Sequence, residues 1–277
     1  GWLMKKEWII YTSGVVPAIS AIIKAMTQPG DKVLVQNPVY NCFFSSIRNN
    51  GCEVVSNDLV YGNQTYTIDF DDFEAKAADP LCKVFLLCNP HNPAGRVWTS
   101  EELCRMGEIC MKHHVFVIAD EIHCELVMPG YHYTPYGLLG EKLSMNAAIC
   151  TSPTKNFNIA GLQISNITVA DADIRARIDR AININEVCDV NPFGVIALQA
   201  AYNESEDWLD QLLIYIHTNY LCLCDFVSQN FPELKVVNME GTYLAWLDCS
   251  AWGMLSQEIE AKLMKAGLWL NAGIHYG

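Results

Sequence analysis

The stretch from residue 147 to residue 162, AAICTSPTKNFNIAGL, joins an apolar run to a small, polar turn that contains Lys155. The run at residues 147–151 predicts a buried strand, and Ser152-Pro153-Thr154 predicts the turn that ends it. A lysine held in such a turn is suited to forming an imine with an aldehyde cofactor. A surface lysine is the commonest alternative, so this motif alone leaves both interpretations open.

Further apolar runs alternate with amphipathic stretches on both sides of this motif. The predicted strands are residues 32–36, 84–88, 115–119 and 164–170, and the predicted helices are residues 15–28, 40–50, 70–79 and 99–112. Thr99-Ser100-Glu101-Glu102 resembles a capping box at the start of the last helix. Strands that are apolar on both faces and separated by helices predict an α/β fold, with a mostly parallel sheet covered by helices on both faces.

The pattern changes near residue 207. A long helix is predicted from residue 206 to about residue 230, followed by strands at 234–237, 242–248 and 268–271 around a helix at 256–266. We therefore expect a large domain at residues 1–206 and a smaller α+β C-terminal domain at residues 207–277.

Composition narrows the class of protein. The chain has 277 residues, half of them apolar, and a net charge of −13, which disfavours nucleic acid and anionic membranes as partners. No apolar run is long enough to span a bilayer and no signal peptide opens the chain, so we expect a cytoplasmic protein. The twelve cysteines are scattered without a Cys-x-x-Cys pair, which favours buried free thiols over a metal site or disulfides.

Polar residues follow three of the predicted strands. The run at 84–88 ends at Asn89-Pro90-His91-Asn92-Pro93, the run at 115–119 ends at Asp120-Glu121-Ile122-His123, and the run at 147–151 ends at Ser152 and Lys155. Because ligands of open α/β sheets gather at the carboxyl ends of the strands, these three clusters predict a common site.

Two of the candidate positions have a physical interpretation and a structural alternative. Gly14 directly precedes the helix at 15–28, whose free N–H groups suit a phosphate, although a glycine before a helix is often only a turn. Asp120 follows an apolar strand, where an unpaired carboxylate would be costly and a protonated pyridine nitrogen would satisfy it. A helix cap or a solvent-facing acid is the alternative for Asp120.

Together, the motifs at Gly14, Asn92, Asp120 and Lys155 resemble the fold-type I pyridoxal-phosphate (PLP) enzymes, over nearly the whole chain. The string NPHNPAGRVW, residues 89–98, resembles the cystathionine β-lyase-like C–S lyase branch of the aminotransferase class I/II family. The resemblance implies a PLP-dependent transferase-like fold. It also implies that Lys155 carries the PLP aldehyde and that the other cofactor contacts come from Gly14 and Val15 (phosphate, by backbone amides), Ser152 (phosphate), Tyr40 (ring stacking), Asn92 (phenolate oxygen), Asp120 (ring nitrogen) and His123 (phenolate oxygen or ring).

Core packing is the alternative for Tyr40 and His123. The implied activity is β-elimination on cysteine S-conjugates such as cystathionine, giving a thiol, pyruvate and ammonia, in a homodimer. An aminotransferase of the same fold is the first alternative. An interaction protein that restrains a transcription regulator is the second, although nothing in the sequence marks such a surface.

The sequence departs from the family pattern in three places. We expect the chain to be incomplete, because it begins close to the Gly14 turn, where the family has an N-terminal arm, and ends before the carboxylate-binding arginine of the family. Gln163 stands where aminotransferases often have a phosphate-binding arginine. Phosphate binding is therefore expected to depend more on backbone amides and on Ser152.

Overall fold

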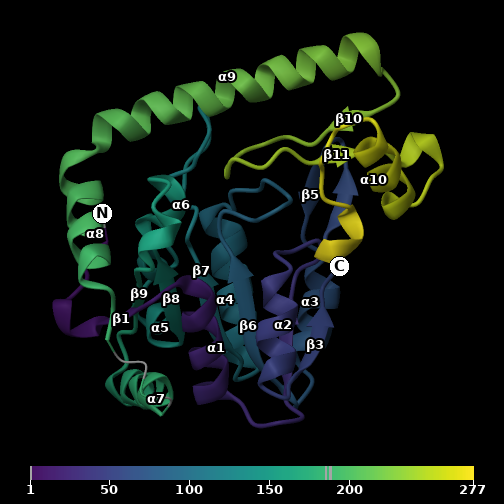
Figure 1. Ribbon diagram of the computed structural model, residues 1–277. Helices are drawn as coiled ribbons and strands as arrows, with labels where there is room; N and C mark the ends of the chain where they lie inside the picture. Colours follow the sequence, from purple (N-terminus) through teal and green to yellow (C-terminus); the bar gives the residue numbers. More distant parts are fainter. Residues whose placement is uncertain (1, 185, 187–188) are drawn as a thin grey trace.

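The computed structural model describes residues 2–184, 186 and 189–277, and a seven-stranded sheet lies at its centre (Figure 1). Five neighbouring strands are parallel to one another. Two further strands extend one edge of the sheet, each antiparallel to the strand before it, so the predicted mostly parallel sheet is confirmed. The strand order across the sheet is β1 (Ile9–Thr12), β9 (Ser165–Thr168), β8 (Ala147–Thr151), β7 (Phe116–Asp120), β6 (Cys82–Cys88), β2 (Lys32–Val35) and β3 (Glu53–Ser56).

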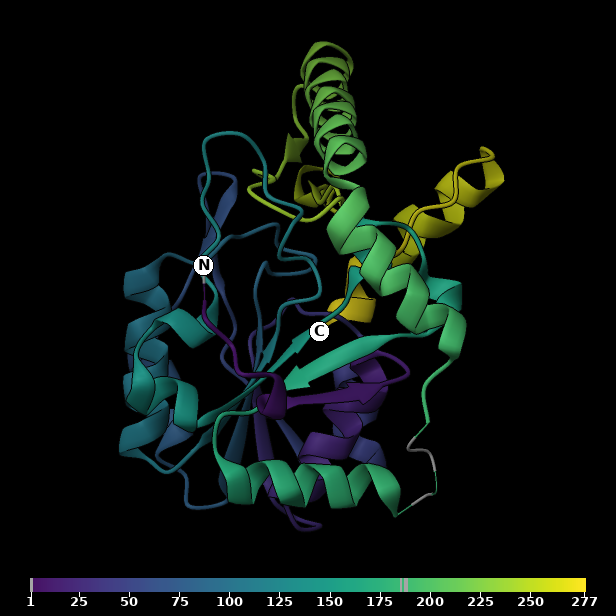
Figure 2. The ribbon, with the colours of Figure 1, turned by 90° about the vertical axis from the view of Figure 1, so that its left-hand side faces the viewer.

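Helices cover both faces of this sheet (Figure 2). The alternation along β6 explains why: Phe85 and Leu87 pack into the core on one face, whereas Val84, Leu86 and Cys88 pack into the core on the other. The first core includes helices α3 (Phe70–Ala77), α4 (Ser100–Lys112) and α5 (Glu141–Met145), and the second includes α1 (Val15–Met26), α2 (Cys42–Asn49) and α7 (Ala172–Asn183).

The C-terminal part of the chain continues from the sheet through two helices. Helix α9 (Glu206–Asn230) leads from α8 (Pro192–Glu204) to the C-terminal segment, as Figure 1 shows along its upper edge. That segment contains β10 (Lys235–Val236), β11 (Leu247–Asp248) and α10 (Ser256–Lys265), and Val227, Leu234 and Val236 form a small core of their own. The expected domain boundary falls at the start of α9 and stays a prediction.

The remaining short elements connect the larger ones. They are the hairpin β4 (Val60–Gly62) and β5 (Thr65–Thr67), the short helix α6 (Pro153–Asn156), and five single-turn 3-10 helices at Lys6–Trp8, Tyr136–Leu138, Ala160–Leu162, Ser250–Trp252 and Gly273–Tyr276. Among the described residues, no helix combines the length and the apolar character that a membrane crossing requires.

The sequence predicted five strands of the sheet and the helices α9 and α10, and its errors lie in both parts of the chain. The capping box of α4 is present, with Thr99 and Glu102 bonded reciprocally. The strand predicted at 268–271 is wrong: these residues are irregular, and Trp269 is 84% exposed. The strand predicted at 242–248 shortens to the two residues of β11. The sequence analysis did not predict β1, β3, α7 and α8.

Candidate active site

The groups that follow β2, β6, β7 and β8 meet in one cavity of about 450 Å³, which we call the site cavity. Seven of the eight predicted site residues line it, namely Gly14, Val15, Tyr40, Asn92, Asp120, His123 and Lys155. Tyr40, Asn92, Asp120, His123 and Lys155 come together because β2, β6, β7 and β8 are parallel, which places the carboxyl ends of these strands at the same edge of the sheet. Gly14 and Val15 follow β1 and lie at the start of α1.

Lys155 is half-buried in the wall of the site cavity, within the short helix α6. Its positive charge acts on two neighbours: it opposes the rise that burial causes in the pKa of Asp120, and it adds to the fall that burial causes in the pKa of His123. Ser152 is the predicted residue that the structure does not bring to the wall. It is fully buried, caps α6 and donates its hydroxyl to the Ile164 carbonyl at 2.7 Å. Thr154 lines the cavity instead.

Asp120 ends β7 in the middle of the sheet and is 4% exposed. One carboxylate oxygen accepts a hydrogen bond from the Ile122 N–H at 3.1 Å. Burial raises the pKa of Asp120 to about 7, against the opposing effects of that N–H and of Lys155. A cationic group placed against this carboxylate would offset the cost of its burial and favour the ionised form.

Asn92 and His123 are buried polar residues with unused hydrogen-bonding capacity. Among the described residues, neither Asn92 Oδ1 nor His123 Nδ1 has a hydrogen-bond partner. Burial, with a smaller contribution from Lys155, lowers the pKa of His123 to about 3, so the imidazole is neutral at physiological pH. Both residues line the site cavity, so a polar ligand bound there can form hydrogen bonds with them.

Helix α1 begins at the site cavity. Gly14 is its N-cap residue, no side chain caps the helix, and its first turn holds no acidic residue. The N–H groups of Val15 and Val16 and the partial positive charge of the helix end are therefore available to an anion. A Cβ atom built on Gly14 would meet only Pro17, at 3.4 Å, so the glycine leaves open space in front of the helix.

Sequence reasoning missed the residues that complete the site cavity from the C-terminal segment, Tyr243, Leu244 and Tyr276. No spacing could have indicated them, because they lie some ninety residues or more from Lys155 along the chain. It also gave no role to Glu121, which is buried beside Asp120. Glu121 accepts hydrogen bonds from the Tyr136 N–H at 2.8 Å and from the Tyr133 hydroxyl, and burial raises its pKa to about 7.

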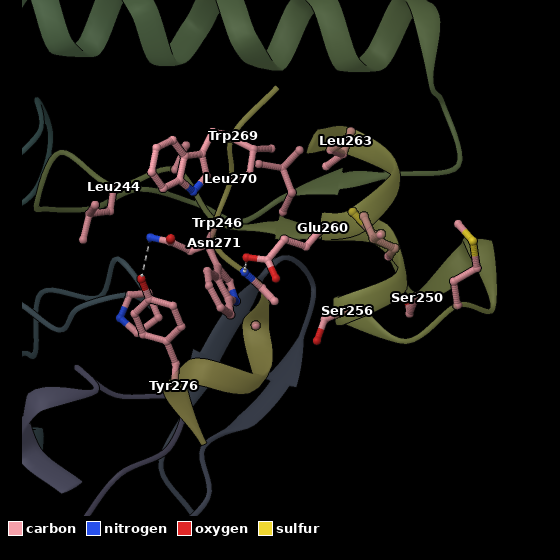
Figure 3. A pocket seen from close by; sticks show the side chains of 18 residues that line it. Leu244, Trp246, Ser250, Ser256, Glu260, Leu263, Trp269, Leu270, Asn271 and Tyr276 are labelled. Carbon is pink, nitrogen blue, oxygen red and sulfur yellow. Dashed lines mark hydrogen bonds between the residues drawn. The ribbon is translucent and has the colours of Figure 1, made fainter. Parts of the chain in front are cut away.

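A larger cavity, of about 580 Å³, lies within the C-terminal segment (Figure 3), and we call it the C-terminal cavity. It shares Leu244 and Tyr276 with the site cavity. Among the described residues that line it there is neither a lysine nor a histidine, and Glu260 is its one carboxylate. Imine formation with an aldehyde needs a lysine amine, so the smaller site cavity, which Lys155 lines, is the candidate active site.

The site cavity fits PLP on the evidence of its own residues. The buried Asp120 carboxylate suits the protonated ring nitrogen, and the unpaired groups of Asn92 and His123 suit the polar substituents of the ring. Tyr40 offers an aromatic face, and the start of α1 suits the phosphate. The Lys155 amine, in the same wall, suits attachment of the cofactor aldehyde. Fold and site together therefore define a PLP-dependent enzyme.

Comparison with known proteins identifies the family. The family model for aminotransferase class I and II matches residues 3–275, and the chain belongs to this family. It is 40% identical over 278 residues to "Cystathionine beta-lyase PatB" of Bacillus subtilis. This alignment covers all of this chain and 72% of that protein. It is also 33% identical over 247 residues to "Protein MalY" of Escherichia coli, and this second alignment covers 87% of this chain and 62% of that protein.

A solved structure supports this family assignment. The crystal structure of cystalysin from Treponema denticola, which contains PLP, superimposes with a TM-score of 0.98 at 36% identity. The match covers all of this chain and 70% of that chain. The PLP-dependent transferase-like fold expected from the sequence is confirmed.

Proposed function

We propose that this protein catalyses PLP-dependent β-elimination on cysteine S-conjugates such as cystathionine, releasing a thiol, pyruvate and ammonia. One observation carries the proposal: Lys155, Asp120, Asn92 and His123 line a single cavity at the carboxyl ends of β6, β7 and β8. The name of the relative from Bacillus subtilis, a cystathionine beta-lyase, supports lyase chemistry in particular.

Some side chains of the site are proposed to bind and orient the cofactor, and Lys155 is proposed to take part in the reaction itself. PLP, when bound, supplies an electron-withdrawing ring that stabilises negative charge at the α-carbon of the amino acid. Asp120 would hold the proton on the ring nitrogen and so keep the ring cationic. Lys155 Nζ would hold the aldehyde of the cofactor and, as a free amine, would remove the α-proton of the bound amino acid. The neutral His123 and the Asn92 amide orient the ring without placing a second cation beside Lys155.

The sulfur substituent explains why elimination follows. After Lys155 has removed the α-proton, the bond between the β-carbon and sulfur breaks and the electron pair leaves on sulfur. A thiolate, whose thiol has a pKa of ~8.5, is a much better leaving group than carbon or hydroxide. Hydrolysis of the remaining unsaturated amino acid gives pyruvate and ammonia.

A product assay with a matched lysine control tests the proposal. The PLP-loaded protein is incubated with L-cystathionine, and the thiol and pyruvate are quantified over time. Lys155→Ala should lose the covalent adduct that borohydride traps and slow thiol release by at least about 10²-fold. Lys142→Ala, which removes an exposed lysine outside the site cavity, should behave as the wild type does.

The same assay separates the lyase from an aminotransferase of this fold. A lyase yields thiol and pyruvate in equal amounts and regenerates PLP at each turnover. An aminotransferase converts the cofactor to its pyridoxamine form and yields a keto acid that still carries sulfur. Accumulation of pyridoxamine phosphate without thiol release would overturn the lyase proposal and leave PLP binding standing.

We further propose that the protein acts as a homodimer in the cytoplasm. Large apolar side chains on α8 and α9 are exposed, and exposed apolar patches favour association; they include Phe193 at 70%, Ile196 at 63%, Ile214 at 67%, Tyr215 at 65% and Phe226 at 55%. The cysteines in the described part of the chain are free, which suits a reducing compartment. Light scattering during size-exclusion chromatography tests the dimer, and a monomer mass would refute it.

A further inference from the structure

The segment at residues 240–244 crosses from the C-terminal part of the chain to the site cavity and presents one aromatic ring to it. Tyr243 lines the cavity and is 40% exposed. Its ring packs edge-on against the His123 ring, with centroids 5.5 Å apart and an interplanar angle of 77°. Leu244 follows it in the same wall and, as Figure 3 shows, also borders the C-terminal cavity.

The backbone around Tyr243 is held firmly. Thr242 is fully buried with a φ of 70°, a conformation that β-branched residues rarely adopt. Its N–H donates to the Leu126 carbonyl at 2.8 Å, and its hydroxyl accepts from the Leu244 N–H at 3.1 Å. A disfavoured backbone conformation persists only where its surroundings impose it, and such positions cluster at functional sites.

Neighbouring residues fix the same segment to the loop that carries Asn92. The N–H groups of Glu240 and Gly241 both donate to the Gly95 carbonyl, at 2.8 and 3.0 Å. A Cβ atom on Gly241 would lie 2.8 Å from a Val97 methyl group and 3.0 Å from the Leu126 carbonyl oxygen, so only glycine fits there. The orientation of Tyr243 is therefore coupled to the loop that holds the candidate cofactor contacts.

We propose that Tyr243 is a specificity-determining residue that contacts the sulfur substituent of the substrate. The inference rests on the proposed function. All of the candidate cofactor contacts come from residues 14–155, whereas Tyr243, Leu244 and Tyr276 form the part of the wall that comes from the C-terminal segment. That part of the wall is left for the substrate. Its aromatic ring suits the group carried on the thioether sulfur, above all an aromatic group, because aromatic rings attract each other, and Leu244 extends the apolar surface.

The substrates for the test are S-benzyl-L-cysteine and S-methyl-L-cysteine, which differ only in the group on sulfur. The readout is the ratio of their kcat/KM values for thiol release. Tyr243→Leu keeps the apolar bulk but removes the ring, and it should lower this ratio about three- to tenfold, because contacts with an aromatic ring contribute on this scale. Tyr243→Phe keeps the ring and should leave the ratio within about twofold of the wild type.

Two controls separate specificity from cofactor binding and from general damage. Tyr131→Leu changes a tyrosine of similar exposure, 46%, outside the site cavity, and should not alter the ratio. The affinity of the cofactor-free protein for PLP, titrated by tryptophan fluorescence, should be unchanged in Tyr243→Leu. An unchanged ratio in Tyr243→Leu, or a fall in PLP affinity as large as the change in ratio, overturns this inference alone. No thiol release by the wild type from L-cystathionine or from either of these substrates overturns the proposed function, and this inference with it. Release from L-cystathionine alone overturns only this inference.

Discussion

Removing the Glu240 carboxylate should destabilise the protein strongly, because this group connects the Asn92 loop to the segment that presents Tyr243. One Glu240 oxygen accepts from Arg96 Nε at 3.0 Å and from the Val97 N–H at 2.8 Å. The two charged side chains are only 9% and 12% exposed. Losing one partner of a buried ion pair costs about 3–5 kcal/mol when the remaining charge is left alone.

Here the remaining charge keeps other partners. The Arg96 guanidinium also donates two hydrogen bonds to Glu102, at 3.1 and 3.0 Å, and one to the Tyr66 carbonyl, and it lies 4.6 Å from the Trp98 ring centroid. The cost of Glu240→Ala is therefore mainly two charge-assisted hydrogen bonds at about 1.5–3 kcal/mol each, partly compensated, so we expect about 3 kcal/mol. At about 2–4 °C per kcal/mol for a chain of this size, the Tm should fall by roughly 6–12 °C.

Urea unfolding and calorimetry of the cofactor-free protein measure this loss. Glu74→Ala is the matched control, because it removes a carboxylate from an exposed ion pair with Lys112 and should leave the unfolding midpoint unchanged. Glu240→Gln keeps an acceptor for the Val97 N–H and should fall between the wild type and Glu240→Ala. If Glu240→Ala unfolds at the same midpoint as Glu74→Ala, the network does not hold the segment and the reasoning fails.

Three further predictions follow from individual residues. Burial raises the pKa of both Asp120 and Glu121 to about 7, so the cofactor-free folded protein binds more protons than the unfolded chain between about pH 4 and pH 7. Its free energy of unfolding should therefore fall as pH rises through that window, with a shallower slope in Asp120→Asn; equal slopes in urea titrations would contradict this. Gly14→Ala places a methyl group before α1, and PLP affinity should fall several-fold at unchanged Tm, as fluorescence titration and calorimetry would show. Gly95→Ala puts a side chain at φ +72°, 3.1 Å from the Asn238 carbonyl oxygen, and should cost at least about 1 kcal/mol in urea unfolding; wild-type stability would refute the crowding.

The sequence determines some elements so strongly that their positions were predictable. Strand β8 was predicted at residues 147–151 and α9 at residues 206–230, and both have those bounds. Strong local patterns explain this success, since β8 is a short apolar run that a turn ends and α9 is a long stretch without glycine or proline. The run at residues 268–271 has a similar apolar pattern but pairs with no described strand, and pairing is a long-range property that composition does not carry.

The same distinction between local patterns and long-range packing separates the site residues that were predictable from those that were not. The residues that follow strand ends were predictable, because the parallel sheet brings those ends together. Ser152 was expected to face the phosphate, but its hydroxyl bonds the Ile164 carbonyl and caps α6, and short polar side chains often make such local bonds. Tyr243 could not be predicted, because its position depends on the packing of the C-terminal segment against the loop at residues 89–98.

The unsatisfied groups of the site link cofactor binding to stability. Asp120, Asn92 and His123 are buried at a cost that the apolar cores on both faces of the sheet must offset. A ligand that pairs with the Asp120 carboxylate and with the free atoms of Asn92 and His123 removes that cost only in the folded state. Such a ligand stabilises the fold by mass action, at about 2.7 kcal/mol when its concentration is 100 times its dissociation constant. The residues proposed to contact PLP are thus the ones expected to make the cofactor-free protein less stable.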